Sequence, residues 1–147
     1  HAKDYVEMQW LMLQQEKPED FVIATGRMES VRKFIELSAE KIGWNQNSNK
    51  PPIIWQGKGI DEIGIRPDTN EIVIKVDKRY FRPTEVEQLK GDAQKAFKKL
   101  GWEPKTSLEE IVNEMIEYDK REALKESILN KEGFKVETYK ESPPKYI

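Results

Sequence analysis

The apolar run at residues 6–13 constrains the fold more than any other feature of this sequence. Asp4 followed by Glu7 fits a capping box, so the sequence predicts a helix over roughly residues 5–15, which the polar residues 17–20 end. A helix that is hydrophobic on most of its sides cannot lie on a surface with only one face covered. We therefore expect this helix to be buried between other elements.

A strand and a second helix are predicted next. Residues 21–24 form a short apolar run closed by Gly26, which is typical of a strand buried on both faces. Ser30 is placed to cap a second helix, and Gly43 is placed to end it. The side chains expected to share one face of this helix are those of Val31, Phe34, Ile35, Ser38 and Ile42. The order helix–strand–helix is typical of the closing edge of a doubly wound α/β sheet.

The pattern changes after a polar loop at residues 44–52. Residues 53–55 and 72–77 are rich in β-branched side chains, and the second run alternates, so both are predicted to be strands. The residues 67–70 between them have the composition of a turn. This part of the chain is therefore expected to contain a small sheet.

Two more helices are predicted towards the end of the chain. Asp92 opens the first and Gly101 ends it, and its expected inward-facing residues are Ala93, Ala96, Phe97 and Leu100. Ser107 and Glu110 fit a second capping box, at the start of a long helix that becomes densely charged from about Lys120.

Together these elements predict an α/β protein in three consecutive parts. Residues 1–43 are interpreted as the edge of a doubly wound domain, residues 44–131 as a small mixed α/β binding domain, and residues 132–147 as a tail that is flexible or docked on a neighbour. The chain starts at His1 without a methionine, directly against a helical pattern, which we interpret as an excised or truncated piece.

Composition narrows the classes of function. The 25 basic and 27 acidic residues leave a net charge of -2, which argues against a dedicated nucleic-acid binder. Cysteine is absent and His1 is the one histidine, so disulfides, thiolate metal sites and most zinc chemistry are not expected. No apolar run reaches the roughly 18 residues of a membrane helix, and no signal peptide is recognisable. A soluble cytoplasmic protein without a membrane partner is the expectation.

No catalytic signature occurs in the sequence. It has no glycine-rich phosphate loop, no nucleophile elbow, no metal-ligand spacing and no Tyr-x-x-x-Lys pair. No residue here is therefore assigned to catalysis, to a cofactor or to a metal, and we expect the segment to act by binding.

The most suggestive binding feature is Arg82, which follows two aromatic residues where a strand is expected to lead into a helical turn at Pro83 and Thr84. A guanidinium there can donate a bidentate fork to phosphate oxygens, and the N–H groups of the turn also attract an anion. Glu85 would lie on the same side and can accept hydrogen bonds from ribose hydroxyls. The competing interpretation, which spacing alone favours, is a surface ion pair between Arg82 and Glu85 worth ~0–1 kcal/mol.

Other candidate residues are assigned to structure rather than to a ligand. Tryptophans can stack on a base, but packing in a core is the favoured interpretation for Trp10, Trp44, Trp55 and Trp102. A salt bridge on the helix surface is favoured over a place in a sugar pocket for Arg32, and Arg66 and Arg79 are expected to be solvated. A solvated helix face is expected for Lys95, Lys98 and Lys99.

Several blocks of the sequence resemble the GDP-mannose 4,6-dehydratases, which are extended short-chain dehydrogenases. The most specific blocks are His-Ala-Lys-Asp-Tyr-Val at residues 1–6 and Tyr-Phe-Arg-Pro-Thr-Glu-Val at residues 80–86. Residues 21–26 and 100–105 are similar to the family in order and spacing. The resemblance extends from residue 1 to about 120; the loop at 47–52 and the tail after Glu132 are not matched.

The resemblance implies a function as well as a fold. It implies a lyase that binds NADP on an upstream Rossmann-type domain and GDP-mannose mainly on a C-terminal domain, here residues 44–131. Such enzymes oxidise the sugar at C4, eliminate water across C5 and C6, and return the hydride to C6. The resemblance assigns Arg82 to the diphosphate and Glu85 to the ribose. The complete enzyme is expected to be a homo-oligomer, and these 147 residues alone are expected to be inactive.

Two other functions stay open on the sequence. One is a different nucleotide-sugar dehydratase, epimerase or reductase of the same superfamily, which selectivity among GDP, UDP and dTDP would reveal. The other is a non-catalytic module that binds a nucleotide sugar.

Overall fold

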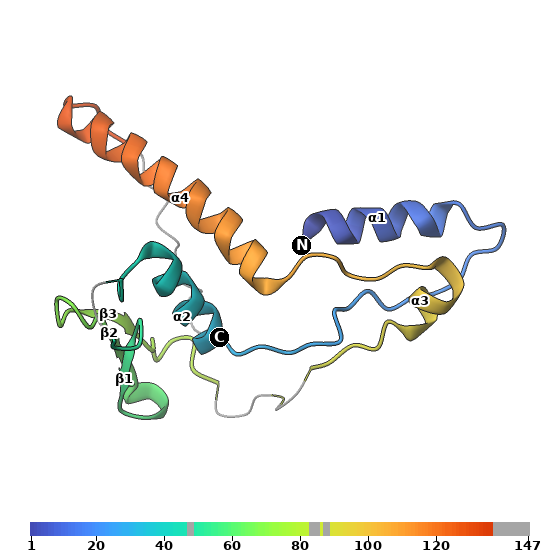
Figure 1. The fold of residues 1–147 in the computed structure, drawn as a ribbon, viewed down its shortest axis with the longest axis horizontal. Coiled ribbons are helices and arrows are strands. Elements are labelled where there is room, and N and C mark those ends of the chain that lie inside the picture. Colours follow the sequence, from blue (N-terminus) through green and yellow to red (C-terminus); the bar gives the residue numbers. More distant parts are fainter. Residues whose placement is uncertain (47–48, 83–85, 87–88, 137–147) are drawn as a thin grey trace. The chain divides into compact units, whose positions relative to one another are not determined.

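The computed structural model describes residues 1–46, 49–82, 86 and 89–136. Within these residues the protein is mixed α/β, as predicted, with four α-helices and a three-stranded antiparallel sheet (Figure 1). The chain packs as two compact units, His1–Phe34 with Thr84–Ile111 and Ile35–Pro83 with Val112–Ile147. The domain boundaries predicted from the sequence, between residues 43 and 44 and between residues 131 and 132, stay a prediction.

The core of the first unit lies between helix α1 (Ala2–Leu13) and helix α3 (Gln94–Leu100). Met8, Ala96 and Trp102 are its buried residues. Partly buried apolar side chains pack against them, namely Leu11, Met12, Phe21, Ile23, Ala93 and Leu100. This small cluster joins the beginning of the chain to residues about ninety positions further on.

Helix α1 differs from its prediction in two ways. Its N-cap is His1, whose Nδ1 accepts a hydrogen bond from the Lys3 main chain at 3.0 Å, so Asp4 does not form the predicted capping box. Val6, Trp10 and Leu13 are 61%, 60% and 82% exposed, so the helix is not buried on most sides. One face packs on the core, and the opposite apolar face is open among the described residues.

The predicted strand at residues 21–24 is also wrong in the described chain, where these residues are irregular. A strand needs a neighbouring strand to pair its N–H and C=O groups. None of the described strands pairs with this segment, although Phe21 and Ile23 do reach the core.

Helix α3 is anchored by lysines that the sequence had assigned to a solvated face. Lys95 Nζ donates to the Asp20 carbonyl at 2.7 Å and lies 4.8 Å from the centre of the Phe21 ring. Lys99 Nζ donates to both oxygens of Glu19, at 2.7 and 2.6 Å. These contacts hold the 19–21 segment against the helix.

The ends of α3 are partly as predicted. The Asp92 side chain accepts from the Gln94 N–H, and Gly101 ends the helix with a φ of 66°. Phe97, however, is 57% exposed rather than inward-facing.

Helix α2 (Val31–Ile42) has the bounds that the sequence predicts. Ser30 Oγ accepts from the Lys33 N–H at 3.0 Å, which satisfies one of the otherwise unpaired donors of the first turn. At the other end Gly43 has a φ of +96°, and the N–H groups of Gly43 and Trp44 both donate to the Ala39 carbonyl at 3.1 Å. Ala39 is buried, whereas Val31 is 77% exposed.

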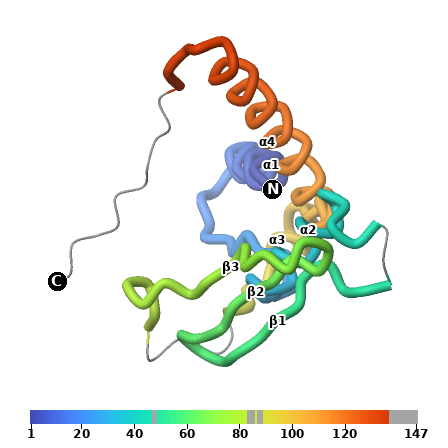
Figure 2. The backbone as a smooth tube through the Cα atoms, turned by 90° about the vertical axis from the view of Figure 1, so that its left-hand side faces the viewer, coloured from blue at the N-terminus to red at the C-terminus, as the bar shows by residue number. Residues whose placement is uncertain are grey.

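The sheet consists of β1 (Ile54–Gln56), β2 (Ile63–Ile65) and β3 (Ile72–Lys75), with a short 3-10 turn at Gly59–Asp61 (Figure 2). Trp55 is opposite Gly64, and Gly64 is opposite Ile74. Strand β2, the central strand, was not predicted from the sequence. Its middle residue must be small, because a Cβ on Gly64 would lie 2.9 Å from Ile74 Cδ1 and 3.1 Å from Ile53 Cγ2.

The predicted turn at residues 67–70 joins β2 to β3. The Asn70 N–H donates to the Arg66 carbonyl and the Arg66 N–H donates to the Glu71 carbonyl, both at 2.9 Å.

The long helix α4 (Leu108–Lys131) begins with the predicted capping box. The Ser107 N–H donates to Glu110 Oε2 at 2.7 Å, and the Glu110 N–H donates to Ser107 Oγ at 3.1 Å. Residues 137–147, most of the predicted tail, lie outside the described part of the chain.

Candidate functional site

The loop that carries the main candidate residue begins with a turn fixed by Asp77. Its carbonyl accepts from the Tyr80 N–H at 3.0 Å, and its side chain accepts from the Arg79 N–H at 2.9 Å. The Arg79 guanidinium also forms an ion pair with the Asp77 carboxylate. These hydrogen bonds lower the pKa of Asp77 to about 2.

Arg79 is therefore bound within its own loop, and the residues after it face solvent. Its guanidinium lies 5.9 Å from the centre of the Tyr80 ring. Tyr80 and Phe81 are about half exposed, and Arg82 is exposed. The loop thus presents two aromatic rings and a cation on its outer side, a set of groups that suits an anionic ligand with a planar ring.

The surroundings predicted for Arg82 lie only in part within the described residues. Strand β3 ends at Lys75 and the next described helix begins at Gln94, so Arg82 does not directly follow a strand end. Glu85, together with the predicted turn at residues 83–84, lies outside the described residues. The pairing of Arg82 with Glu85 therefore stays a prediction.

A second arginine of the same unit is also engaged. Arg66 forms an ion pair with Asp68, with Nε 2.6 Å from Oδ1 and Nη2 2.8 Å from Oδ2. Its guanidinium lies over the Trp44 ring, 4.9 Å from the ring centre. Hydrogen bonding to Asp68 raises the pKa of Arg66. Arg66 and Arg79 were expected to be solvated, and both instead form an ion pair with a nearby aspartate.

The tryptophans have different environments. Trp102 is buried, as predicted, and Trp55 is partly buried with its Nε1–H donating to Glu36 Oε1 at 2.9 Å. Trp10 is 60% exposed, so the prediction of core packing is wrong for this residue.

Two grooves occur in the first unit, and sequence reasoning found neither. One, of about 510 Å³, lies between residues 24–26, 90–97 and 102–104. The other, of about 300 Å³, lies between residues 25–29 and 104–111 and includes the Arg27 side chain. One residue of the sequence could have indicated a groove here. Gly26 has a φ of +68°, which lets the chain turn at the groove wall.

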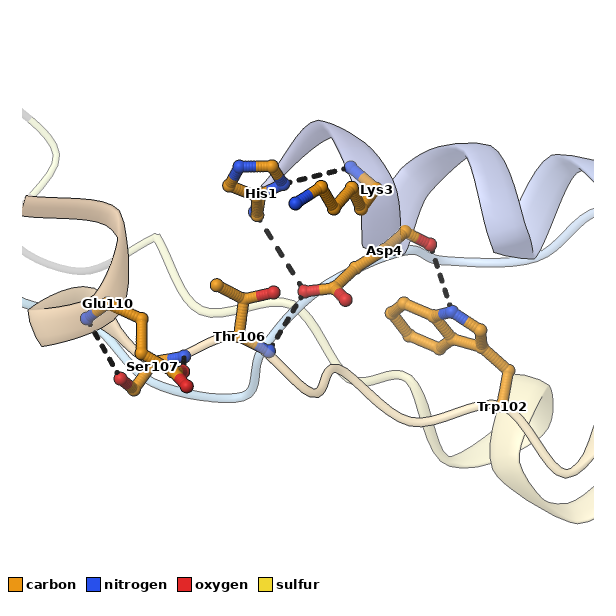
Figure 3. Close-up of polar contacts among 7 residues, drawn as sticks. All are labelled: His1, Lys3, Asp4, Trp102, Thr106, Ser107 and Glu110. Atoms are coloured by element: carbon orange, nitrogen blue, oxygen red, sulfur yellow. Dashed lines mark hydrogen bonds and ion pairs between the residues drawn. The ribbon is translucent and has the colours of Figure 1, made fainter. Parts of the chain in front are cut away.

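Contacts of Asp4 hold the segment that lines parts of both grooves, with Trp102 in the first and Thr106 in the second. Asp4 is 4% exposed, and its Oδ2 accepts from the Thr106 N–H at 3.2 Å (Figure 3). The Trp102 Nε1–H donates to the Asp4 carbonyl at 3.0 Å. Burial by itself raises the pKa of Asp4, but the hydrogen bonds from Thr106 and the Lys105 main chain outweigh it and keep the pKa below its usual value.

No helix in the described part of the chain has both the length and the apolar composition that crossing a bilayer requires.

Comparison with known proteins adds a family to this geometry. The profile of the family described as GDP-mannose 4,6 dehydratase matches residues 1–115. A GDP-mannose 4,6-dehydratase of Yersinia enterocolitica is 45% identical over 152 residues, which cover 97% of this chain and 39% of that protein.

Two animal proteins are equally similar. The GDP-mannose 4,6 dehydratase of Cricetulus griseus is 50% identical over 119 residues, covering 81% of this chain and 30% of that protein. The human GDP-mannose 4,6 dehydratase is 49% identical over the same length, with the same coverage. The chain spans about a third of the length of these curated relatives.

Proposed function

The chain belongs to the GDP-mannose 4,6-dehydratase family, and from this premise we propose that it is the GDP-mannose-binding C-terminal portion of such an enzyme. The complete enzyme would convert GDP-mannose into its 4-keto-6-deoxy derivative. In that reaction the sugar is oxidised at C4, loses water across C5 and C6, and is reduced at C6.

The observation that carries this proposal is the loop at residues 77–82. Asp77 binds Arg79 and thereby fixes the turn, and Arg82 follows it on the exposed side. An arginine suits a diphosphate because its planar fork can donate two parallel hydrogen bonds to phosphate oxygens. We propose that Arg82 binds the diphosphate and that Glu85 binds the ribose.

The residues present do not fit an NADP site. The sequence has no glycine-rich loop between a strand and a helix, and the described sheet is antiparallel, whereas dinucleotides bind at the ends of parallel strands. We propose that NADP, which would accept and return the hydride, is held by residues that this sequence does not contain. We assign no step of the reaction to the residues of this chain.

The test is an Arg82→Ala substitution in a full-length enzyme that contains this segment. We expect GDP-mannose binding to weaken by ~1.5–3 kcal/mol, the range for hydrogen bonds to charged groups, as measured by calorimetry. Arg121→Ala is the matched control, because Arg121 is an exposed arginine on α4 whose Nε donates to the Glu117 carbonyl of its own helix. Competition with UDP and dTDP would show selectivity for the guanine nucleotide. Unchanged affinity in Arg82→Ala would remove Arg82 from the site.

We further propose that the enzyme is a homo-oligomer, and that the isolated 147-residue chain self-associates. The exposed face of α1 supports self-association of the isolated chain. Its apolar stripe, formed by Val6, Trp10 and Leu13, is in contact with water in a single molecule. Gel filtration of the isolated chain should show species larger than a monomer, and Trp10→Glu should reduce them. A single monomeric peak for the unaltered chain would contradict this expectation.

A further inference from the structure

Asp4 is the one buried charged side chain among the described residues. A buried carboxylate is costly unless hydrogen bonds replace the water that it loses. The partners of Asp4 are therefore informative about what this residue does, and they lie about a hundred positions away along the chain.

Helix α1 holds the segment at residues 102–107 by three contacts. The Asp4 carboxylate accepts from the Thr106 N–H, and the Asp4 carbonyl accepts from the Trp102 indole. Next to them, Glu7 Oε1 pairs with Lys105 Nζ at 2.6 Å. The contact to Thr106 is partly buried, the contact to Trp102 is buried, and the contact to Lys105 is exposed.

The residue that follows Thr106 begins the capping box of α4. The Ser107 N–H donates to Glu110 Oε2, and Ser107 Oγ accepts from the Glu110 N–H. Both bonds require the main chain at Ser107 to keep one orientation. The Thr106 N–H, one residue earlier, is bound to Asp4, so the carboxylate restrains the main chain just before the cap (Figure 3).

We propose that Asp4 is a positioning residue that couples α1 to the start of α4, by holding residues 102–107 so that the Ser107–Glu110 capping box can close. It acts through the main chain of Thr106, one residue before the cap. The wall of the 300 Å³ groove, which includes residues 104–109, depends on the same contacts.

The electrostatics around Asp4 agree with this arrangement. Hydrogen bonds from Ser107 lower the pKa of Glu110, while burial and the nearby charge of Asp4 act to raise it. The two carboxylates are thus close enough to interact, so the pKa of Glu110 also reports on the distance between them.

The test is amide hydrogen exchange of the 147-residue chain, followed by NMR. Asp4→Ala should speed exchange of the Thr106 amide and also of the Ser107 and Glu110 amides, by about tenfold, since each loses a hydrogen bond of ordinary strength. Glu7→Gln, which weakens only the exposed contact to Lys105, should leave the Ser107 and Glu110 amides unchanged. Faster exchange at Thr106 alone would overturn the proposal.

Asp4→Asn keeps the test decisive if Asp4→Ala does not fold. Its carboxamide oxygen can still accept from Thr106 but without the negative charge, so exchange at the same three amides should rise by a smaller factor. In this variant the pKa of Glu110 should also fall, because the neighbouring charge is gone. Unaltered exchange at Ser107 and Glu110 together with an unaltered Glu110 pKa would overturn the coupling.

Discussion

Asp4 in the first unit and Asp77 in the second are both held ionised, but by different means. Asp4 is buried, and main-chain and indole N–H groups from residues far along the chain bind it or its carbonyl. Asp77 is exposed and is bound by Arg79, two residues away. Removing the Asp4 carboxylate would therefore leave the partly buried Thr106 N–H without its acceptor, whereas removing that of Asp77 would return its donors to water.

Asp4 therefore helps to organise the fold, whereas Asp77 determines the conformation of a loop. Buried hydrogen bonds between distant segments determine which parts of the chain meet, because leaving them unmade is costly. An exposed ion pair contributes little to stability, since water competes for both partners. Its value in this chain is local, because it fixes the turn that precedes Arg82.

The largest effect is expected from Asp4→Ala. This change leaves the partly buried Thr106 N–H without its acceptor, so the free energy of unfolding should fall by roughly 1–3 kcal/mol. Urea unfolding, followed by circular dichroism, measures it. The free energy of unfolding of Asp4→Asn should lie between that of Asp4→Ala and that of the unaltered chain. A stability equal to that of the unaltered chain in both variants would show that Asp4 and Asp77 do not differ in the way described.

The smallest effect is expected from acid titration of Asp77. Its pKa is lowered in the folded protein to about 2, so the folded state binds its proton less readily than the unfolded chain does. The stabilisation from its ion pair is therefore complete above the ordinary aspartate pKa and is lost as the pH falls towards about 2. Asp77→Asn should remove this part of the pH dependence while changing stability at neutral pH less than Asp4→Ala does.

Thermal unfolding across pH 2–6 would check the Asp77 prediction, with NMR titration of the Asp77 carboxylate as the direct measurement. A folded-state pKa at or above the ordinary aspartate value would contradict it. So would a loss of stability in Asp77→Asn as large as that in Asp4→Ala.

Local signals in the sequence predicted the local features correctly. The caps at Ser30 and Ser107 and the helix ends at Gly43 and Gly101 depend on neighbours within five residues, so the pattern contains what is needed to recognise them. The turn at residues 67–70 was found for the same reason.

Features that depend on distant partners were missed or misread. Asp4 and Glu7 have the spacing of a capping box, yet the true partner of Asp4 is Thr106, which no local pattern can reveal. Residues 21–24 have the composition of a strand but find no partner strand among the described residues. Strand β2 was missed because Gly64, which packing against Ile53 and Ile74 requires, lowers the strand propensity of its segment.

The role of the candidate site stays a prediction. The aromatic and arginine sequence before Pro83 indicated Arg82 as a candidate, and Arg82 is exposed in the structure. No sequence motif marks Arg27, which lines the 300 Å³ groove of the first unit. The two segments that form that groove are about eighty positions apart in the sequence.

The proposed binding of a guanine nucleotide sugar by Arg82 can be tested by a crystal structure of a full-length enzyme that contains this segment, with GDP-mannose bound. We expect the Arg82 guanidinium to lie about 2.7–3.2 Å from diphosphate oxygens, with Glu85 at the ribose hydroxyls. A bound nucleotide whose diphosphate is held by other residues, with Arg82 turned into solvent, would contradict it.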